Sequence, residues 1–200
     1  MASGEKQSWR WLNWSILLVF GGAVFLIGLI SAGVFDPKPI GDPIDTLPLA
    51  PLEVNAGQVR LNWLALSVPD TDHSLRLEAA LIEGEVDSAY GLVIGDESEN
   101  LLVAISPVGY VTILINSNLE ERPIIPWRTW PHVAMGNSAN ELWLDIEGDE
   151  LTAVRTNREL LWQGSLSVPG KGIGLWVESY GGPAKIDFSS LELFAAEPNT

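Results

Sequence analysis

A stretch without any charged side chain, from Trp11 to Phe35, constrains this chain of 200 residues more than any other feature. Residues 16–30, at its centre, are all apolar or glycine. A helix needs about 20 mostly apolar residues to cross the hydrocarbon core of a bilayer, so the stretch predicts a transmembrane helix over residues 14–35. Residues 1–13 then form a short segment on one side of the membrane, and residues 36–200 lie on the other.

The charges on either side of this stretch predict its orientation. Lys6 and Arg10 precede it, whereas the segment that follows has more Asp than Lys. Trp9, Trp11 and Trp14 stand at the basic end, and indole rings favour the headgroup region. Short cytoplasmic segments are enriched in Lys and Arg, so we expect a single-pass protein of the cell membrane with a cytoplasmic N-terminus and an extracytoplasmic domain.

A cleaved signal peptide is the alternative, because the small residues Ser31 and Gly33 fit a cleavage site. The apolar run exceeds the roughly 7–15 residues of a signal peptide's apolar region, which favours an uncleaved anchor. Three small residues, Gly21, Gly28 and Ala32, would let a second helix pack closely on this one. Gly28 and Ala32 have the small-xxx-small spacing of such contacts.

Downstream of the apolar stretch the sequence changes character twice. Residues 36–51 contain five prolines, which exclude a helix and favour extended chain, so we expect a semi-rigid linker there. From residue 52 to residue 195, short runs of alternating apolar residues recur between turn residues, which is typical of an all-β sandwich. Residues 196–200 form a tail. Strands are expected near residues 74–82, 90–94, 101–105, 110–115, 141–147, 151–156, 172–179 and 185–194.

Four segments between residues 75 and 194 combine turn residues with apolar positions in a recognisable pattern. They contain Tyr90, Gly91, Leu92, Val93, Asp96 and Asn100; Asn140, Leu142, Leu144 and Gly148; Gly172, Gly174, Leu175, Val177, Glu178 and Ser179; and Phe188 and Leu191. In this pattern the chain resembles the concanavalin A-like, laminin-G-like jelly rolls of bacterial envelope proteins, including the 3-keto-disaccharide hydrolase-like domains. Ser189 and Ser190 replace two acids of that family. The resemblance implies a two-sheet antiparallel jelly-roll sandwich and leaves the function open.

The domain is strongly acidic, which narrows its choice of partners. The chain has 11 Lys and Arg against 26 Asp and Glu, and all but three of these charges follow the apolar stretch. Phosphates of nucleic acids would be repelled by such a domain, whereas a basic protein would be attracted. The chain has no cysteine, which excludes disulfides, thiolate metal sites and cysteine nucleophiles.

The nearest approach to a catalytic motif is Asp145-Ile146-Glu147. Jelly-roll glucanases carry Glu-x-Asp-x-Glu on one strand, where the period of two places the carboxylates on one face. Here Trp143 stands in place of the first carboxylate. We therefore expect Trp143, Asp145 and Glu147 to face outward without a catalytic role, so that neutralising either acid leaves the fold nearly unchanged.

Acidic and aromatic residues supply two candidate binding sites. Asp96, Glu97 and Glu99 could coordinate calcium through oxygen ligands, although an acidic turn is the commoner explanation and no cofactor is expected. Among the tryptophans, Trp127 and Trp130 lie in a segment without regular alternation and form, with Trp143, a candidate aromatic patch. Exposed indoles stack on sugars or anchor protein interfaces.

These features favour a non-catalytic binding module anchored in the membrane, serving as an accessory subunit of a larger complex. Its helix would pack on other membrane subunits, and its acidic domain would recruit a basic protein. A carbohydrate- or cell-wall-binding module is the alternative. An enzyme of glycoside chemistry is least favoured, because the glucanase-type motif lacks its first carboxylate.

The orientation is tested by adding a protease to intact cells. We expect it to remove the chain after about residue 36 and to spare an N-terminal tag, because the basic flank faces the cytoplasm. Immunoblots against tags at the two ends would record the result, with permeabilised cells as the control. A C-terminal tag that survives in intact cells would contradict the predicted orientation.

Overall fold

The computed structural model describes residues 4–31, 33, 36–117 and 120–197, with side chains described from residue 14 onward. The chain divides into two compact units, Met1–Lys38 and Pro39–Thr200.

The first unit contains one helix, α1 (Gly4–Ser31). Its segment Trp14–Ser31 has a mean hydropathy of 2.3 and is long and apolar enough to cross a membrane, although a signal sequence has the same properties. At Gly21 and Gly28 no atom lies within 4 Å of where a Cβ would stand, so the backbone there is open to a neighbouring helix. Ala32, the third predicted packing position, lies outside the described residues.

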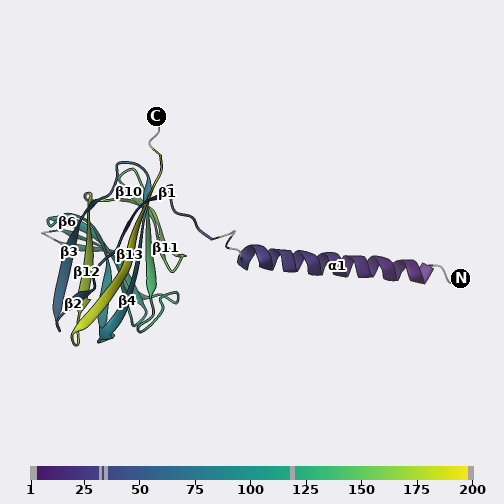
Figure 1. Ribbon diagram of the computed structural model, residues 1–200, viewed down its shortest axis with the longest axis horizontal. Coiled ribbons are helices and arrows are strands. Elements are labelled where there is room, and N and C mark those ends of the chain that lie inside the picture. The colour runs from purple at the N-terminus through teal and green to yellow at the C-terminus, as the bar shows by residue number, and fades with distance from the viewer. Residues whose placement is uncertain (1–3, 32, 34–35, 118–119, 198–200) are drawn as a thin grey trace. The chain divides into compact units, whose positions relative to one another are not determined.

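The second unit is a sandwich of two antiparallel sheets, as the sequence predicted (Figure 1). In sheet A the strands lie in the order β1-β13-β4-β9-β10-β11, with the short strand β2 also paired to β13. In sheet B the order is β3-β12-β5-β6-β7-β8. The strands of sheet A are β1 (Asp42–Leu47), β2 (Leu52–Val54), β4 (His73–Gly84), β9 (Asn140–Glu147), β10 (Glu150–Thr156), β11 (Glu159–Ser167) and β13 (Ala184–Ala195). The strands of sheet B are β3 (Gln58–Ser67), β5 (Ser88–Gly95), β6 (Glu99–Ser106), β7 (Tyr110–Ser117), β8 (Glu121–Thr129) and β12 (Gly172–Ser179).

The core lies between the two sheets and takes alternate residues from the inner strands. In β4, Leu75, Leu77 and Leu81 point into it and are almost completely buried. Tyr90 of β5 and Phe188 of β13 meet edge to face across the core, with their ring centroids 6.5 Å apart. Each fully buried side chain of this size contributes about 1.5–3 kcal/mol to folding, so the alternation fixes which face of every strand looks outward.

The predicted linker is partly wrong, because residues 42–47 form strand β1. This strand pairs with the C-terminal strand β13 at the edge of sheet A, with Asp42 opposite Ala195 and Leu47 opposite Leu191. An edge strand tolerates proline, since its outer N–H groups need no partner, and the pairing also shifts register just after Pro43. The prolines therefore exclude a helix here without excluding a strand.

Trp143 and Asp145 face outward, as the sequence predicted, but neighbouring side chains cover them. Both residues lie on the outer face of sheet A, yet Trp143 is only 2% exposed and Asp145 only 6%. The guanidinium of Arg155, on the neighbouring strand, lies over the indole ring at 5.4 Å from its centroid and forms an ion pair with Asp145. The same carboxylate accepts hydrogen bonds from Trp143 Nε1 at 2.7 Å and Ser74 Oγ at 2.6 Å. Alternation gives the face of a residue, but neighbouring side chains decide whether water reaches it.

This cluster predicts that Asp145 stabilises the fold. Replacing it with alanine leaves the Arg155 guanidinium and two hydrogen-bond donors without their partner in a covered site, so we expect Asp145→Ala to lower the free energy of unfolding by about 3 kcal/mol. Glu147→Ala, an exposed control two residues along the same strand, should change it by less than about 0.5 kcal/mol. Urea unfolding followed by tryptophan fluorescence measures both. Equal effects of the two variants would contradict this role for Asp145.

Candidate functional site

A hollow of about 360 Å³ lies at one end of the outer face of sheet B, and we call it the aromatic pocket. Three of its lining residues are aromatic and two are polar. The lining residues are Asp87, Ser106, Val108, Tyr110, Trp127 and Tyr180.

Strand ends and one irregularity place these side chains together. Ser106 ends β6 and pairs with Tyr110, which begins β7, and the tight turn between them is closed by a hydrogen bond from Gly109 N to Ser106 O at 2.9 Å. The pairing of β7 with β8 shifts between Val111 and Ile113, and Trp127 lies in β8 opposite this shift. A bulge of this kind redirects a side chain at the edge of a sheet.

The three aromatic rings of the pocket remain partly in contact with water. Tyr110 is 40% exposed, Trp127 is 38% exposed and Tyr180 is 46% exposed. Large aromatic side chains usually bury most of their surface, so three partly exposed rings around one hollow indicate a surface that fits a flat, partly apolar ligand. Trp and Tyr also lose little conformational entropy on binding, because each has only two side-chain torsions.

Hydrogen bonds orient the polar groups around the pocket. The hydroxyl of Tyr180 donates to Glu178 Oε2 at 2.7 Å, and its backbone N–H donates to the carbonyl of Asp87 at 3.0 Å. Partial burial, the hydrogen bond to Glu178 and the charges of Glu178, Asp87 and Glu121 together raise the pKa of Tyr180 well above its usual value. The phenol therefore stays neutral. Ser106 Oγ donates to the carbonyl of Ser88 at 2.7 Å, which leaves its oxygen able to accept.

A second aromatic group, the tryptophan layer, occupies the same outer face of sheet B. Trp63 of β3 and Trp176 of β12, both half-buried, pack on a small apolar cluster, and glycines allow the rings to lie close to the sheet. At Gly174, for example, a Cβ would stand 3.0 Å from the ring of Trp63. The apolar cluster consists of Val93, Leu102, Ala104 and Leu114.

The register of sheet B connects the tryptophan layer with the aromatic pocket. Trp176 pairs with Gly91, Gly91 pairs with Ala104, and Ala104 pairs with Thr112. Thr112 lies opposite the irregular part of β8 that carries Trp127. Directly paired residues share a face, so one row across five strands runs from one indole to the other through small residues. Neighbouring strands are about 4.8 Å apart, which makes this row about 19 Å long.

The structure does not bring the three predicted tryptophans together. Trp127 lines the aromatic pocket, whereas Trp143 is buried on the other sheet. Trp130 is half-buried against the main core, with the Arg128 guanidinium 5.8 Å from its ring centroid and the His132 ring at 5.4 Å. Its Nε1 is buried without a hydrogen-bond partner. Of the predicted aromatic patch, only Trp127 lines this pocket.

The sequence analysis missed the two tyrosines of the pocket. Tyr110 directly precedes Val111, which faces the core as Ile113 does, so the period of two would have placed Tyr110 on the outer face of the sheet. Tyr180 directly follows β12. Nothing in the local sequence brings these residues to Trp127, because their proximity depends on the order of the strands in sheet B.

In the predicted acidic turn, the carboxylate of Asp96 accepts hydrogen bonds from groups of the same turn. Asp96 Oδ1 accepts hydrogen bonds from the backbone N–H of Ser98 at 2.7 Å and of Glu99 at 3.1 Å, and from Ser98 Oγ at 2.5 Å. The Ser98 hydroxyl and then these backbone N–H groups lower the pKa of Asp96. Among the residues that the structure describes, no group of three His, Asp or Glu residues is arranged to hold a metal ion.

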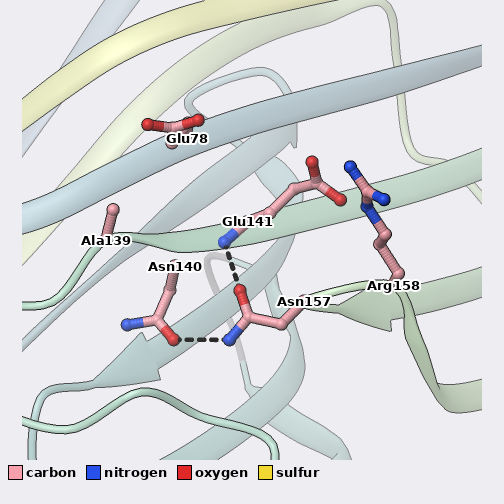
Figure 2. A pocket seen from close by; sticks show the side chains of 6 residues that line it. All are labelled: Glu78, Ala139, Asn140, Glu141, Asn157 and Arg158. Atoms are coloured by element: carbon pink, nitrogen blue, oxygen red, sulfur yellow. Dashed lines mark hydrogen bonds between the residues drawn. The ribbon is translucent and has the colours of Figure 1, made fainter. Parts of the chain in front are cut away.

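A polar hollow of about 280 Å³ at the end of β9 is built around two asparagines (Figure 2). The buried Asn140 accepts from the backbone N–H of Ala134 at 2.7 Å and donates to the hydroxyl of Tyr90 at 3.1 Å. Asn157, which has a positive φ of 52°, donates to the carbonyl of His132 at 2.6 Å and to Asn140 Oδ1 at 2.8 Å. These bonds attach the loop before β9 to the β10–β11 hairpin, so the two amides serve the fold.

Charged side chains rim this hollow. Glu78 and Glu141 are cross-strand partners on β4 and β9, and Figure 2 shows Glu141 beside Arg158. Burial raises the pKa of Glu141, while the charges of Arg76 and Arg158 act in the opposite direction. The nearest Arg76 nitrogen lies 3.7 Å from the Glu141 carboxylate. The rim thus combines both signs of charge, unlike the aromatic pocket.

Comparisons with known proteins identify the fold without identifying a family. A scan against protein-family models finds no match. A search of curated proteins finds no significant relative either.

Solved structures do resemble this chain. The carbohydrate-binding module CBM66 from Bacillus subtilis matches with a TM-score of 0.57 and 14% identity, over 79% of this chain and 100% of that one. An endo-acting O-glycanase of the human gut microbiota matches with a TM-score of 0.53 and 9% identity, over 74% of this chain and 79% of that one. Sheep galectin-11 matches less well, with a TM-score of 0.48 and 11% identity over 70% of this chain and 99% of that one. The domain therefore has the concanavalin-like jelly-roll sandwich that the resemblance in sequence implied.

Proposed function

We propose that this protein is a non-catalytic carbohydrate-binding module, anchored in a membrane by α1, that holds a glycan at the aromatic pocket of sheet B. The observation that carries the proposal is the gathering of Tyr110, Trp127 and Tyr180, all partly exposed, around one hollow with a carboxylate in its wall. The pocket reverses the order of preference that the sequence suggested, since carbohydrate binding was the alternative there.

Sugars suit this pocket on physical grounds. One face of a pyranose presents mainly C–H groups, which pack on an indole or phenol ring, and burying them gains about 25 cal/mol per Å². The hydroxyl groups around the sugar need hydrogen-bond partners, which Asp87 and the oxygen of Ser106 can supply. Three rigid rings and two polar groups match the usual composition of a small-molecule site, mostly apolar with a few placed polar atoms.

The structural comparisons support the same proposal. The Bacillus subtilis protein that matches over its full length is a carbohydrate-binding module. At 14% identity this likeness shows a shared fold, so the argument for sugar binding rests on the residues of the pocket. The finer resemblance to 3-keto-disaccharide hydrolase-like domains remains a prediction from the sequence.

The arrangement around Asp145 supports a non-catalytic role. A retaining glycosidase of this motif type needs two free carboxylates about 5.5 Å apart on either side of the scissile bond. Here Asp145 is covered and is bonded to Arg155, Trp143 and Ser74, while Trp143 occupies the position of the first carboxylate. Glu147 then stands exposed as the remaining acid of the motif.

An accessory subunit of a membrane complex is the second candidate, and the open backbone of α1 at Gly21 and Gly28 favours it. The two roles are compatible, because the helix and the pocket lie in different units. In both, the anchor is uncleaved and the domain extracytoplasmic, where glycans are found. Neither role requires calcium.

The proposal predicts that Trp127 anchors the ligand. The full-length protein in detergent should bind members of a glycan array that includes neutral oligosaccharides. Trp127→Ala should weaken binding about 10- to 30-fold, because a central aromatic anchor contributes about 2 kcal/mol. Isothermal titration calorimetry of the best neutral oligosaccharide gives the two affinities.

Leu160→Ala is the matched control, since Leu160 is an exposed apolar residue on β11 of the other sheet. It should leave the affinity unchanged. Failure to bind any glycan on the array would overturn the proposed function. Equal affinities of wild type and Trp127→Ala would instead overturn the assignment of the pocket.

A further inference from the structure

The aromatic pocket carries a one-sided charge, and from this we propose that it selects glycans bearing amino groups over glycans bearing carboxylates or sulfates. The inference rests on the proposed function, since it names the class of sugar that the same pocket would hold. Partly N-deacetylated amino sugars are the chemical class concerned, because their free amines are largely protonated in mildly acidic solution.

The lining of the pocket supplies the first argument. Asp87 is its charged residue, and none of the six described lining residues is Lys, Arg or His. A second carboxylate, Glu178, lies at the hydroxyl end of Tyr180 and accepts the hydrogen bond from that hydroxyl at 2.7 Å. An ammonium group on a sugar bound among the three rings would therefore lie near the carboxylate of Asp87, which lines the pocket. The carboxylate of Glu178, at the hydroxyl end of Tyr180, would attract it as well.

The protonation of Tyr180 supplies a second argument. Apart from burial and the hydrogen bond to Glu178, the charges of Glu178, Asp87 and Glu121 raise the pKa of Tyr180. A field that opposes a negative phenolate also attracts a positive ammonium at the same place. Aromatic faces strengthen the preference, because cations are attracted to the electron-rich faces of Trp and Tyr.

The opposite end of the same outer face also carries negative charge. A hollow of about 330 Å³ beside Trp63 is lined by Asp96 and Glu97 and, among its described residues, by no basic one. Asp96 has a lowered pKa and stays ionised. A chain of several sugars lying along the face would pass from one acidic hollow toward the other.

Four basic side chains elsewhere in the domain are engaged with other groups. Lys171 forms an ion pair with Asp70, and Lys185 forms one with Glu53. Arg60 donates to the carbonyl of Glu53 at 3.1 Å. Arg128 lies over the ring of Trp130, which is packed against the core. These residues therefore do little to offset the negative charge of the pocket.

The test compares matched glycans that differ only in charge. The probes are β-1,4-linked tetrasaccharides of glucose, glucosamine and glucuronate, together with the amine and carboxylate derivatives of the best neutral ligand from the array. At low salt and about pH 6, where Asp and Glu are ionised, we expect the amine form to bind about fivefold more tightly than the neutral form and the carboxylate form about fivefold more weakly. The preference should shrink in 0.5 M salt at a Debye length of about 4 Å, because exposed charges are then screened.

Two variants separate the local charge from the net charge of the domain. Asp87→Asn should bring the ratio of amine to neutral affinity close to one. Glu150→Gln removes the same unit charge from an exposed position on β10 of the other sheet and should leave that ratio unchanged. Titration calorimetry with the full-length protein measures the ratio directly, so a general loss of affinity in either variant does not disturb the comparison.

The outcomes distinguish this inference from the proposed function. Neutral glycans that bind through Trp127, with an amine-to-neutral ratio of one or less in the wild type, would overturn the amine preference and leave the binding module intact. Equal ratios in Asp87→Asn and wild type would overturn the role of Asp87. Absence of binding to every probe and every glycan on the array would overturn the proposed function and the inference with it.

Discussion

The contact between the two sheets is the constraint on which the rest of this domain depends. Each strand must turn one set of alternate side chains inward, as Leu75, Leu77 and Leu81 do in β4, and the other set is thereby committed to an outer face. The two outer faces differ in the side chains that they carry and in how far these are covered. On the outer face of sheet A, Arg155 covers the ring of Trp143 and forms an ion pair with Asp145. Sheet B leaves aromatic rings at the surface.

This difference assigns separate parts to the two outer faces: the cluster on sheet A stabilises the fold, and the aromatic pocket on sheet B is the proposed binding site. On sheet A, Asp145 is bonded to Arg155, Trp143 and Ser74, so a ligand at this cluster would have to break bonds that the fold already makes. On sheet B the rings of Tyr110, Trp127 and Tyr180 surround a hollow and remain 38–46% exposed, so their surface is free for the proposed ligand. The acidic character of the chain, which the composition alone assigns to no particular place, reaches that hollow through Asp87 in its lining, while Glu178 accepts the hydrogen bond of the Tyr180 hydroxyl.

Much of the architecture could be predicted from the sequence, because helix length and a period of two are local signals. The uncharged run predicted α1, and the alternation predicted eight of the strands, four in each sheet. Strands β2, β3, β8 and β11 were not predicted, and the segment around Trp127, which was expected to lack regular alternation, is part of β8. Strand β1 was missed since prolines hide an edge strand whose partner, β13, lies at the far end of the chain. The sequence correctly predicted that Trp143 lies on the outer face of its sheet, but it did not predict that Arg155 covers the ring. The aromatic pocket was out of reach, because it depends on which strands become neighbours.

Strand β1 has a mechanical consequence. It is the first strand of the sandwich after α1, and it is held at a sheet edge by pairing with β13. A pull between a bound glycan and the anchored helix would load this edge strand before the strands inside the sheet. Peeling its six residues away would add about 20 Å of extended chain while leaving the sandwich largely intact. If α1 anchors the protein as proposed, this edge strand would supply extra tether length, and the distance of the pocket from the bilayer would then depend on the applied force.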